Sequence, residues 1–215
     1  MTDKVGKNTL IIFLKYPEAG KVKTRLAKEV GAQKAADIYS YMAKKIIENV
    51  LDKDCYRTII FYDPPEKKNG IKTWLGNKQY LIIPQAGETL GDKIIDAFAQ
   101  VFSSGADKAV IIGTDCIDIS SETITKAIKS LNGVDVVLGP AEDGGYYLLG
   151  LSSHIPEIFH EIQWSTDRVL NQTLERIKEK KLNYELLKTL KDIDTIDDLS
   201  SQLQGFVKTE EGREG

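Results

Sequence analysis

Short, unbroken runs of apolar residues alternate along this chain with longer amphipathic stretches. Runs of strand length that are apolar throughout are typical of strands covered on both faces. Their alternation with helical segments predicts an α/β fold with a mostly parallel sheet. We expect strands at Thr9–Leu14, Thr58–Tyr62, Tyr80–Ile83, Ala109–Ile112, Asp135–Leu138, Tyr146–Leu151 and, more briefly, Tyr184–Leu187.

The stretches between these runs carry helical periodicity. In the first long stretch, one helix face is formed by Ala35, Tyr39, Met42, Ile46 and Val50. Further helices are expected over Gly91–Phe102, Ser121–Leu131 and Ser165–Lys180, from near Thr24, and from Asp194 or Thr195 near the end of the chain.

One connection departs from the alternation. The segment Gly139–Gly145 is rich in turn residues and too short for a crossover helix, so one strand beside it should run against its neighbours. The sheet should therefore be mixed, in a three-layer α/β sandwich. No linker or repeat divides the 215 residues, and we expect one domain over 1–215, with a polar tail from about residue 204.

Composition excludes several classes of protein. The chain has 29 basic and 32 acidic residues, a balance that argues against a general nucleic-acid binder. Its two cysteines, Cys55 and Cys116, favour a reducing compartment over a disulfide framework. No apolar stretch approaches the ~20 residues of a membrane span, and no signal peptide is expected. We expect a cytoplasmic protein.

A basic cluster follows the first predicted strand. Lys15, Lys21, Lys23 and Arg25 crowd a turn that contains Gly20. Ligands of such sheets bind beyond the carboxyl ends of the strands, where Arg and Lys suit phosphate groups. Each lysine alone could lie on a solvated surface turn, but the cluster at this position favours phosphate binding. It lacks the glycine spacing of a Walker loop and of a dinucleotide-binding fingerprint.

Two further segments follow predicted strands. Gly113 and Asp115 come directly after a buried run, and a carboxylate at such a strand end can hold Mg²⁺ or Mn²⁺. The alternative for Asp115 is a turn or capping role. Asp143, Gly144 and Gly145 allow close approach of a ligand, although a plain tight turn explains them as well.

An acidic segment, Asp192–Asp198, precedes the last expected helix. Thr195 and Asp198 have the spacing of a capping arrangement. The segment could also fold back to the sheet edge and supply a second metal ligand.

Together these segments resemble the nucleotide-diphospho-sugar transferase superfamily, which has the glycosyltransferase-A type fold, and within it the bacterial DUF2064 group of glycosyltransferase-like proteins. The resemblance extends from Leu10 to about Leu199. It rests on Phe13–Arg25, Gln85–Gly91, Gly113–Asp115, Gly139–Tyr146, Trp164–Thr166 and Asp192–Thr195. The chain departs from the group's usual pattern at Ile117, where Pro is common, and at Lys93, where Arg is common.

The resemblance implies that the first loop receives nucleotide phosphates, with Lys23 and Arg25 at the basic positions of related nucleotidyltransferases. It implies that Asp115 is a metal-binding aspartate and that Asp194 matches a second one found in some relatives. It also implies that Asp143–Gly145 lines the acceptor side.

We therefore expect a metal-dependent transferase acting on a nucleoside triphosphate or a nucleotide sugar and on a small acceptor, with no nucleic-acid partner. Lys23, Arg25 and Asp115 would neutralise phosphate charge, and Asp143 could deprotonate an acceptor hydroxyl in a glycosyl transfer. Nucleotidyl and glycosyl transfer both stay open at this point, as does assembly as a homodimer. The alternative is a non-catalytic nucleotide-binding or scaffold protein on the same fold.

Overall fold

The computed structural model describes residues 7–76, 80–199 and 203. It contains a seven-stranded sheet with the order β3-β2-β1-β4-β6-β5-β7. The strands are β1 (Asn8–Lys15), β2 (Arg57–Asp63), β3 (Leu81–Pro84), β4 (Lys108–Ile112), β5 (Val136–Pro140), β6 (Tyr146–Leu151) and β7 (Tyr184–Leu186). Each predicted strand is present.

One strand runs against the rest of the sheet. β1 to β4 are mutually parallel, and β6 pairs antiparallel with both β4 and β5. The short β7 is parallel to β5. The mixed sheet expected from the short connection at Gly139–Gly145 is confirmed.

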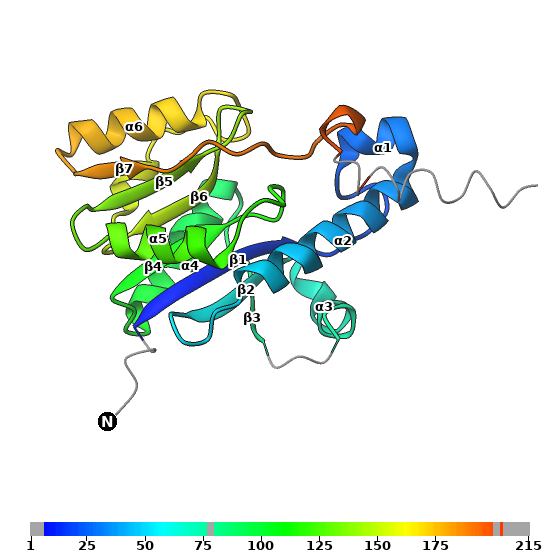
Figure 1. Cartoon of the computed structure of the whole chain (residues 1–215), viewed down its shortest axis with the longest axis horizontal. Helices are drawn as coiled ribbons and strands as arrows, with labels where there is room; N and C mark the ends of the chain where they lie inside the picture. Colours follow the sequence, from blue (N-terminus) through cyan, green and yellow to red (C-terminus); the bar gives the residue numbers. More distant parts are fainter. Residues whose placement is uncertain (1–6, 77–79, 200–202, 204–215) are drawn as a thin grey trace, which may run out of the picture.

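Helices cover both faces of the sheet (Figure 1). They are α1 (Thr24–Val30), α2 (Ala32–Val50), α3 (Lys68–Trp74), α4 (Leu90–Ser103), α5 (Ser121–Ser130) and α6 (Val169–Glu179), with short 3₁₀ turns η2 (Pro65–Lys67), η3 (Pro156–Phe159) and η4 (Ile196–Asp198). Because strand side chains alternate, Leu10 and Ile12 pack with α2, α3 and α5, while Ile11 packs with α4, η3 and α6. The α/β three-layer prediction is confirmed.

Three details differ from the sequence expectation. The helix expected from Ser165 begins at Val169, because Ser165 has a positive φ of 63° and the preceding residues form a turn. The short α3 was not predicted. The last expected helix begins as the 3₁₀ turn η4, which Thr195 caps, and Leu203 is also helical. The rest of the chain beyond Leu199, including the predicted tail, lies outside the described residues.

The chain order places a topological switch point beyond the carboxyl ends of β1 and β4, and we call this position the crevice. From β1 the chain builds β2 and β3 on one side, then crosses to β4 on the other side. At such a switch point the loops beyond the carboxyl ends of the two strands diverge and leave room for a ligand. The segment Lys15–Arg25, called the first loop, runs from the last residue of β1 to the second residue of α1, and the segment from Gly113 follows β4.

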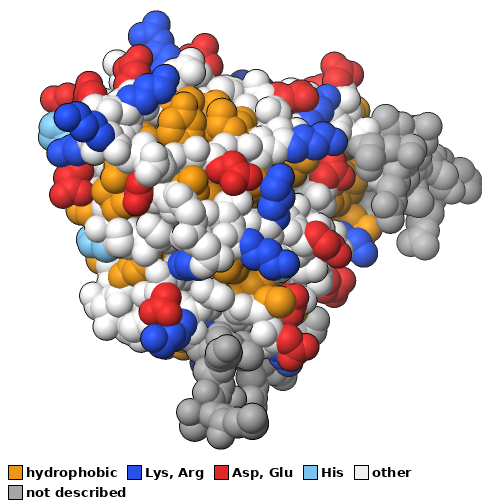
Figure 2. All heavy atoms as spheres, turned by 60° about the vertical axis from the view of Figure 1, so that its left-hand side comes forward, with side chains coloured by type: hydrophobic (Ala, Val, Ile, Leu, Met, Phe, Trp, Pro, Cys, Tyr) orange, Lys and Arg blue, Asp and Glu red, His pale blue; other side chains and the backbone are white. Residues whose placement is uncertain are grey.

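Figure 2 shows the face on the left-hand side of Figure 1. Acidic and basic side chains are interspersed there, with hydrophobic side chains exposed between them, so neither sign of charge prevails on this face. Within the described part of the chain, no helix combines the length and apolar character needed to cross a bilayer.

Candidate active site

The first loop turns one lysine inward and leaves the other basic side chains outside. Gly20 adopts a positive φ of 76° at the turn, a conformation that suits glycine. Lys23, immediately before α1, is left-handed as well, with φ 45° and ψ 49°. The Lys23 side chain is only 3% exposed, whereas that of Arg25 is 74% exposed. Lys15, at the end of β1, is also exposed.

The buried ammonium of Lys23 joins two carboxylates from distant parts of the chain. Its Nζ forms an ion pair with Asp115, just beyond β4, and donates a hydrogen bond of 3.2 Å to Asp194 Oδ1. Arg25 donates to the other oxygen of Asp194 at 3.3 Å. Four residues that the sequence singled out separately therefore meet at the crevice.

The charges around Lys23 Nζ shift the pKa values of Lys23 and of nearby Asp192. Burial alone would lower the pKa of Lys23, but the charges of Asp115 and Asp194 outweigh it and raise that pKa. Burial raises the pKa of Asp192, and the negative charges of Asp143 and Asp194 add to the effect. Asp192 was not a candidate from the sequence, where it was one acid among several in its segment.

The acidic segment folds back to the sheet edge and is anchored there. The Ile193 N–H donates to the Asp115 carbonyl at 3.1 Å, and the Ile193 side chain is buried with residues of α1 and α2. Asp198 accepts hydrogen bonds from the backbone N–H groups of Asp194, at 3.0 Å, and Thr195, at 2.8 Å. The capping arrangement and the fold-back, weighed as alternatives from the sequence, are both present, and the cap fixes the backbone of Asp194.

A buried phenol links the two strands that frame the crevice. Tyr39 Oη accepts a hydrogen bond of 2.9 Å from the backbone N–H of Lys15 and lies 3.0 Å from Thr114 Oγ1. Burial raises the pKa of Tyr39 well above its usual range, and the charge of Asp115 adds to this, so the phenol stays protonated. This link was not predicted from the sequence, where its signal was Tyr39, a residue with a polar tip on the apolar face of α2.

The predicted acceptor-side turn has a defined structure. Asp143 is exposed, and its Oδ1 accepts a hydrogen bond of 2.8 Å from the Gly145 N–H. Gly144 has φ 87°, and a Cβ there would lie 2.2 Å from the carbonyl oxygen of Asp167. Within the described residues, no hydrogen bond or ion pair connects Asp143 to Lys23. The negative charge of Asp143 nevertheless acts on the acidic residues near Lys23, because it helps to raise the pKa of Asp192.

The fit of a divalent cation rests on two carboxylates. Within the described residues, no group of three or more His, Cys, Asp and Glu side chains could hold a metal ion. Asp115 and Asp194 nevertheless both contact the single nitrogen of Lys23, so they bracket one cation position. Mg²⁺ is commonly bound by one or two carboxylates, with water and substrate phosphates completing its shell. The donor set fits such an ion.

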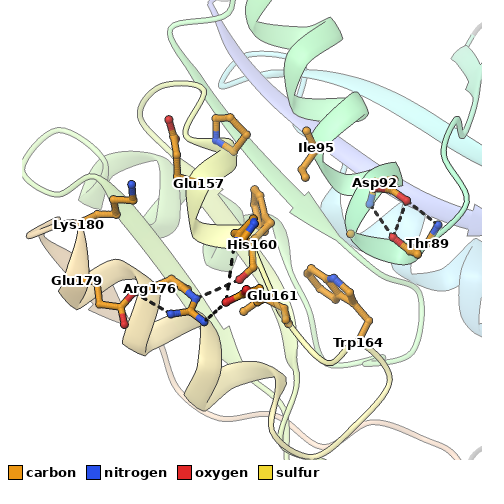
Figure 3. Close-up of a pocket in the computed structure, with 14 residues that line it drawn as sticks. Thr89, Asp92, Ile95, Glu157, His160, Glu161, Trp164, Arg176, Glu179 and Lys180 are labelled. Carbon is orange, nitrogen blue, oxygen red and sulfur yellow. Dashed lines mark hydrogen bonds and ion pairs between the residues drawn. The ribbon is translucent and has the colours of Figure 1, made fainter.

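A separate hollow of about 780 Å³ lies between α4, η3 and α6 (Figure 3). Its charged groups are largely paired with each other: Arg176 donates to Glu179 at 2.8 Å, to Glu161 at 3.2 Å and to the His160 carbonyl at 3.1 Å. Trp164 lies over the first turn of α4, where Gly91 leaves room for the indole. These contacts hold residues 160–164 against α4 and α6, which is a structural role.

A family model matches residues 46–166 of the chain, more than half of its length. It is the model of a family described as uncharacterized proteins conserved in bacteria, DUF2064. The chain belongs to this family. Among curated proteins, none matches the chain.

Solved structures agree with the DUF2064 assignment. A crystal structure from Desulfovibrio desulfuricans G20, of a candidate nucleotide-diphospho-sugar transferase, is 34% identical with a TM-score of 0.83; the alignment covers 89% of this chain and 84% of that one. The DUF2064 chain thus has the nucleotide-diphospho-sugar transferase fold.

Two more distant structures share only the fold. CMP:2-keto-3-deoxy-manno-octonic acid synthetase with CTP is 10% identical at a TM-score of 0.57, covering 94% of this chain and 99% of that one. The 4-diphosphocytidyl-2C-methyl-D-erythritol synthase of Anaerococcus prevotii DSM 20548 is 12% identical at 0.58, covering 89% and 94%.

Proposed function

We propose that this chain is a metal-dependent transferase that binds a nucleoside triphosphate at the crevice between β1 and β4 and transfers the nucleotidyl group to a small acceptor. One observation carries the proposal: the basic first loop and two carboxylates from elsewhere in the chain meet around Lys23 Nζ. The 34% identical relative from Desulfovibrio desulfuricans, described as a candidate nucleotide-diphospho-sugar transferase, supports the same class of chemistry.

The first loop would bind the phosphates. Arg25 is mostly exposed and has one hydrogen bond to Asp194, so its guanidinium can turn towards a phosphate and form two parallel hydrogen bonds. Lys15 and Lys21 are exposed on the same loop and have no ion pair within the described residues. Gly20 and Gly113, at the turn and directly after β4, would let the backbone come close to the nucleotide.

Asp115 and Asp194 would hold the divalent cation, Mg²⁺ or Mn²⁺. Such an ion supplies positive charge to the phosphate oxygens and to the leaving group. Lys23 and Arg25 would add to that charge at the phosphates.

The choice of nucleotidyl transfer follows from the number of cations on the first loop. A triphosphate carries more negative charge than the diphosphate of a nucleotide sugar and gains more from four basic residues. In this reaction, an acceptor phosphate or carboxylate oxygen bonds to the α-phosphorus while the bond to the bridging oxygen breaks and pyrophosphate leaves. Two nucleotidyltransferases share the fold.

Glycosyl transfer is the second candidate because Asp143 is exposed on the turn beside the acidic cluster. There its carboxylate could take the proton of an acceptor hydroxyl, while a nucleoside diphosphate leaves the sugar. Asp143, Gly144 and Gly145 would then line the acceptor.

The leaving group decides between these reactions. The protein would be incubated with Mn²⁺, a panel of nucleoside triphosphates and nucleotide sugars, and the small-molecule fraction of a bacterial extract, with Asp115→Asn as the control. We expect pyrophosphate from the wild type and none from the variant. Nucleoside diphosphate released from a sugar nucleotide would favour glycosyl transfer. Nucleotide binding without either product would identify a non-catalytic binding protein and contradict the proposal.

A further inference from the structure

Lys23 occupies the position between Asp115 and Asp194 where a metal ion would make its two protein contacts. Its Nζ forms an ion pair with Asp115 Oδ1 and lies 3.2 Å from Asp194 Oδ1. The Lys23 side chain is 3% exposed, while the two carboxylates are 56% and 35% exposed. The Lys23 ammonium group is thus buried, whereas the carboxylates of Asp115 and Asp194 are partly exposed to solvent.

The backbone of Lys23 is strained where its side chain turns inward. Lys23 has the left-handed conformation, φ 45° and ψ 49°, which a residue with a Cβ adopts at an energetic cost. No side-chain hydrogen bond caps the start of α1. The ion pairs with Asp115 and Asp194 therefore offset the strain of the left-handed backbone at Lys23.

Without a cation, the two carboxylates would face each other. Both contact one nitrogen atom, so a single ion can contact both, and like charges at such separations repel. Among the described residues, Arg25 forms an ion pair with Asp194 alone, through the oxygen that Lys23 does not contact. The neutralisation of Asp115 in the ligand-free protein therefore depends on Lys23.

We propose that Lys23 is the resident counter-ion of the metal position and that a divalent cation binds by expelling its ammonium group, which then contacts the nucleotide phosphates. The inference rests on the function proposed above. A flexible four-carbon stem lets the lysine ammonium move from the carboxylates to a nearby phosphate. Metal should bind weakly to the free protein, and nucleotide and metal should each strengthen the binding of the other.

A different role for Lys23 makes the opposite prediction. If its ion pairs only hold α1 and the acidic segment to β4, loss of the ammonium would let Asp115 and Asp194 move apart. Metal affinity would then fall or stay the same. The sign of the change in metal affinity on removal of the lysine charge therefore separates the two roles.

The test measures Mn²⁺ binding to the metal-free full chain without nucleotide, from the loss of the free-ion electron paramagnetic resonance signal. Lys23→Met should bind Mn²⁺ about tenfold more tightly than the wild type, because the competing charge is gone. Lys28→Met, exposed in the last turn of α1 and outside the proposed site, should match the wild type. Lys23→Met combined with Asp115→Asn should lose the gain. Lys23→Gln, which keeps a polar stem, provides a second neutral variant should the methionine variant unfold.

Equal or weaker Mn²⁺ binding by folded Lys23→Met and Lys23→Gln would overturn the proposal, as would no binding by any form. A second titration, with a nucleoside triphosphate, keeps the two proposals apart. If nucleotide fails to bind to any form while Lys23→Met still gains Mn²⁺ affinity, the proposed function fails and the counter-ion role stands. If nucleotide binds normally but neither Lys23 variant gains Mn²⁺ affinity, only the counter-ion role fails.

Discussion

The hydroxyl oxygens of Tyr39 and Thr114 lie 3.0 Å apart, which ties α2 to the first turn beyond β4. Tyr39 also accepts the backbone N–H of Lys15 at the end of β1, at 2.9 Å. Because that bond uses an acceptor site of the phenol, its hydrogen is available to Thr114. One buried hydroxyl group thus bridges the ends of the two paired strands whose loops carry Lys23 and Asp115.

The Tyr39→Phe variant should keep the aromatic packing of α2 but lose this link. We expect the free energy of unfolding, measured by urea denaturation, to fall by about 1–2 kcal/mol, since two partners lose a hydrogen bond. Tyr62→Phe is the matched control, because the Tyr62 hydroxyl is also buried but makes only a long contact of 3.4 Å with the Pro65 carbonyl. Equal losses in the two variants would show that the Tyr39 link has no special weight.

The Arg25→Ala variant should weaken nucleotide binding but leave the free energy of unfolding nearly unchanged. The side chain is 74% exposed, and its one ion pair within the described part of the chain is with Asp194, at 3.3 Å, so the free energy of unfolding should change by less than about 1 kcal/mol. Nucleotide affinity, measured by calorimetry, should fall about tenfold or more, because a charged phosphate contact is lost. Arg25→Lys should recover part of it, since lysine restores the charge but not the forked geometry. Unchanged affinity in Arg25→Ala would remove this residue from the site.

Asp198→Ala should act on the site through Asp194. Asp198 accepts the N–H groups of Asp194 and Thr195 and pairs with Lys191 at 2.8 Å. Its loss should lower the free energy of unfolding by about 1–2 kcal/mol and weaken Mn²⁺–nucleotide binding, although Asp198 holds no metal in this account. The exposed neighbour Asp197→Ala is the control. If nucleotide binding in Asp198→Ala matches that of the control, the cap does not position Asp194.

Two glycines with positive φ should respond differently to alanine. Gly20 has φ 76° with open space around it, whereas a Cβ on Gly144 would lie 2.2 Å from a backbone oxygen. Gly20→Ala should therefore cost about 1 kcal/mol of unfolding free energy from backbone strain alone. Gly144→Ala should cost about 2 kcal/mol or more, because the segment at Asp167 must also move. Similar urea midpoints for the two variants would contradict this difference.

Much of the fold could be predicted because it depends on local patterns. Short apolar runs marked the strands, with Glu185 interrupting the run of β7. The seven-residue connection Gly139–Gly145 predicted that one strand beside it is reversed, and this strand is β6. The predicted start of α6 was wrong. The left-handed backbone conformation of Ser165 and the packing of the turn at Asp167 on Gly144 depend on tertiary contacts. The short α3 lies between β2 and β3, a stretch to which the sequence analysis assigned no helix.

The candidate site could be predicted only in outline. The rule that ligands bind beyond parallel strands brought the first loop and Asp115 to the same sheet edge. The sequence offered Asp194 only through the family resemblance, since the return of the acidic segment depends on the burial of Ile193 against α1 and α2. It did not reveal that Lys23 is buried, because that follows from a left-handed backbone conformation that lysine rarely adopts.

The central claim is that the first loop and the two aspartates bind one metal–nucleotide complex. Thermal unfolding with Mn²⁺ and a panel of nucleoside triphosphates tests it most directly, in the wild type and in Asp115→Asn. A nucleotide at 100 times its dissociation constant should stabilise the wild type by about 2.7 kcal/mol. We predict a metal-dependent shift with at least one nucleotide that is absent in Asp115→Asn. Equal metal-dependent shifts in the two proteins would contradict the account.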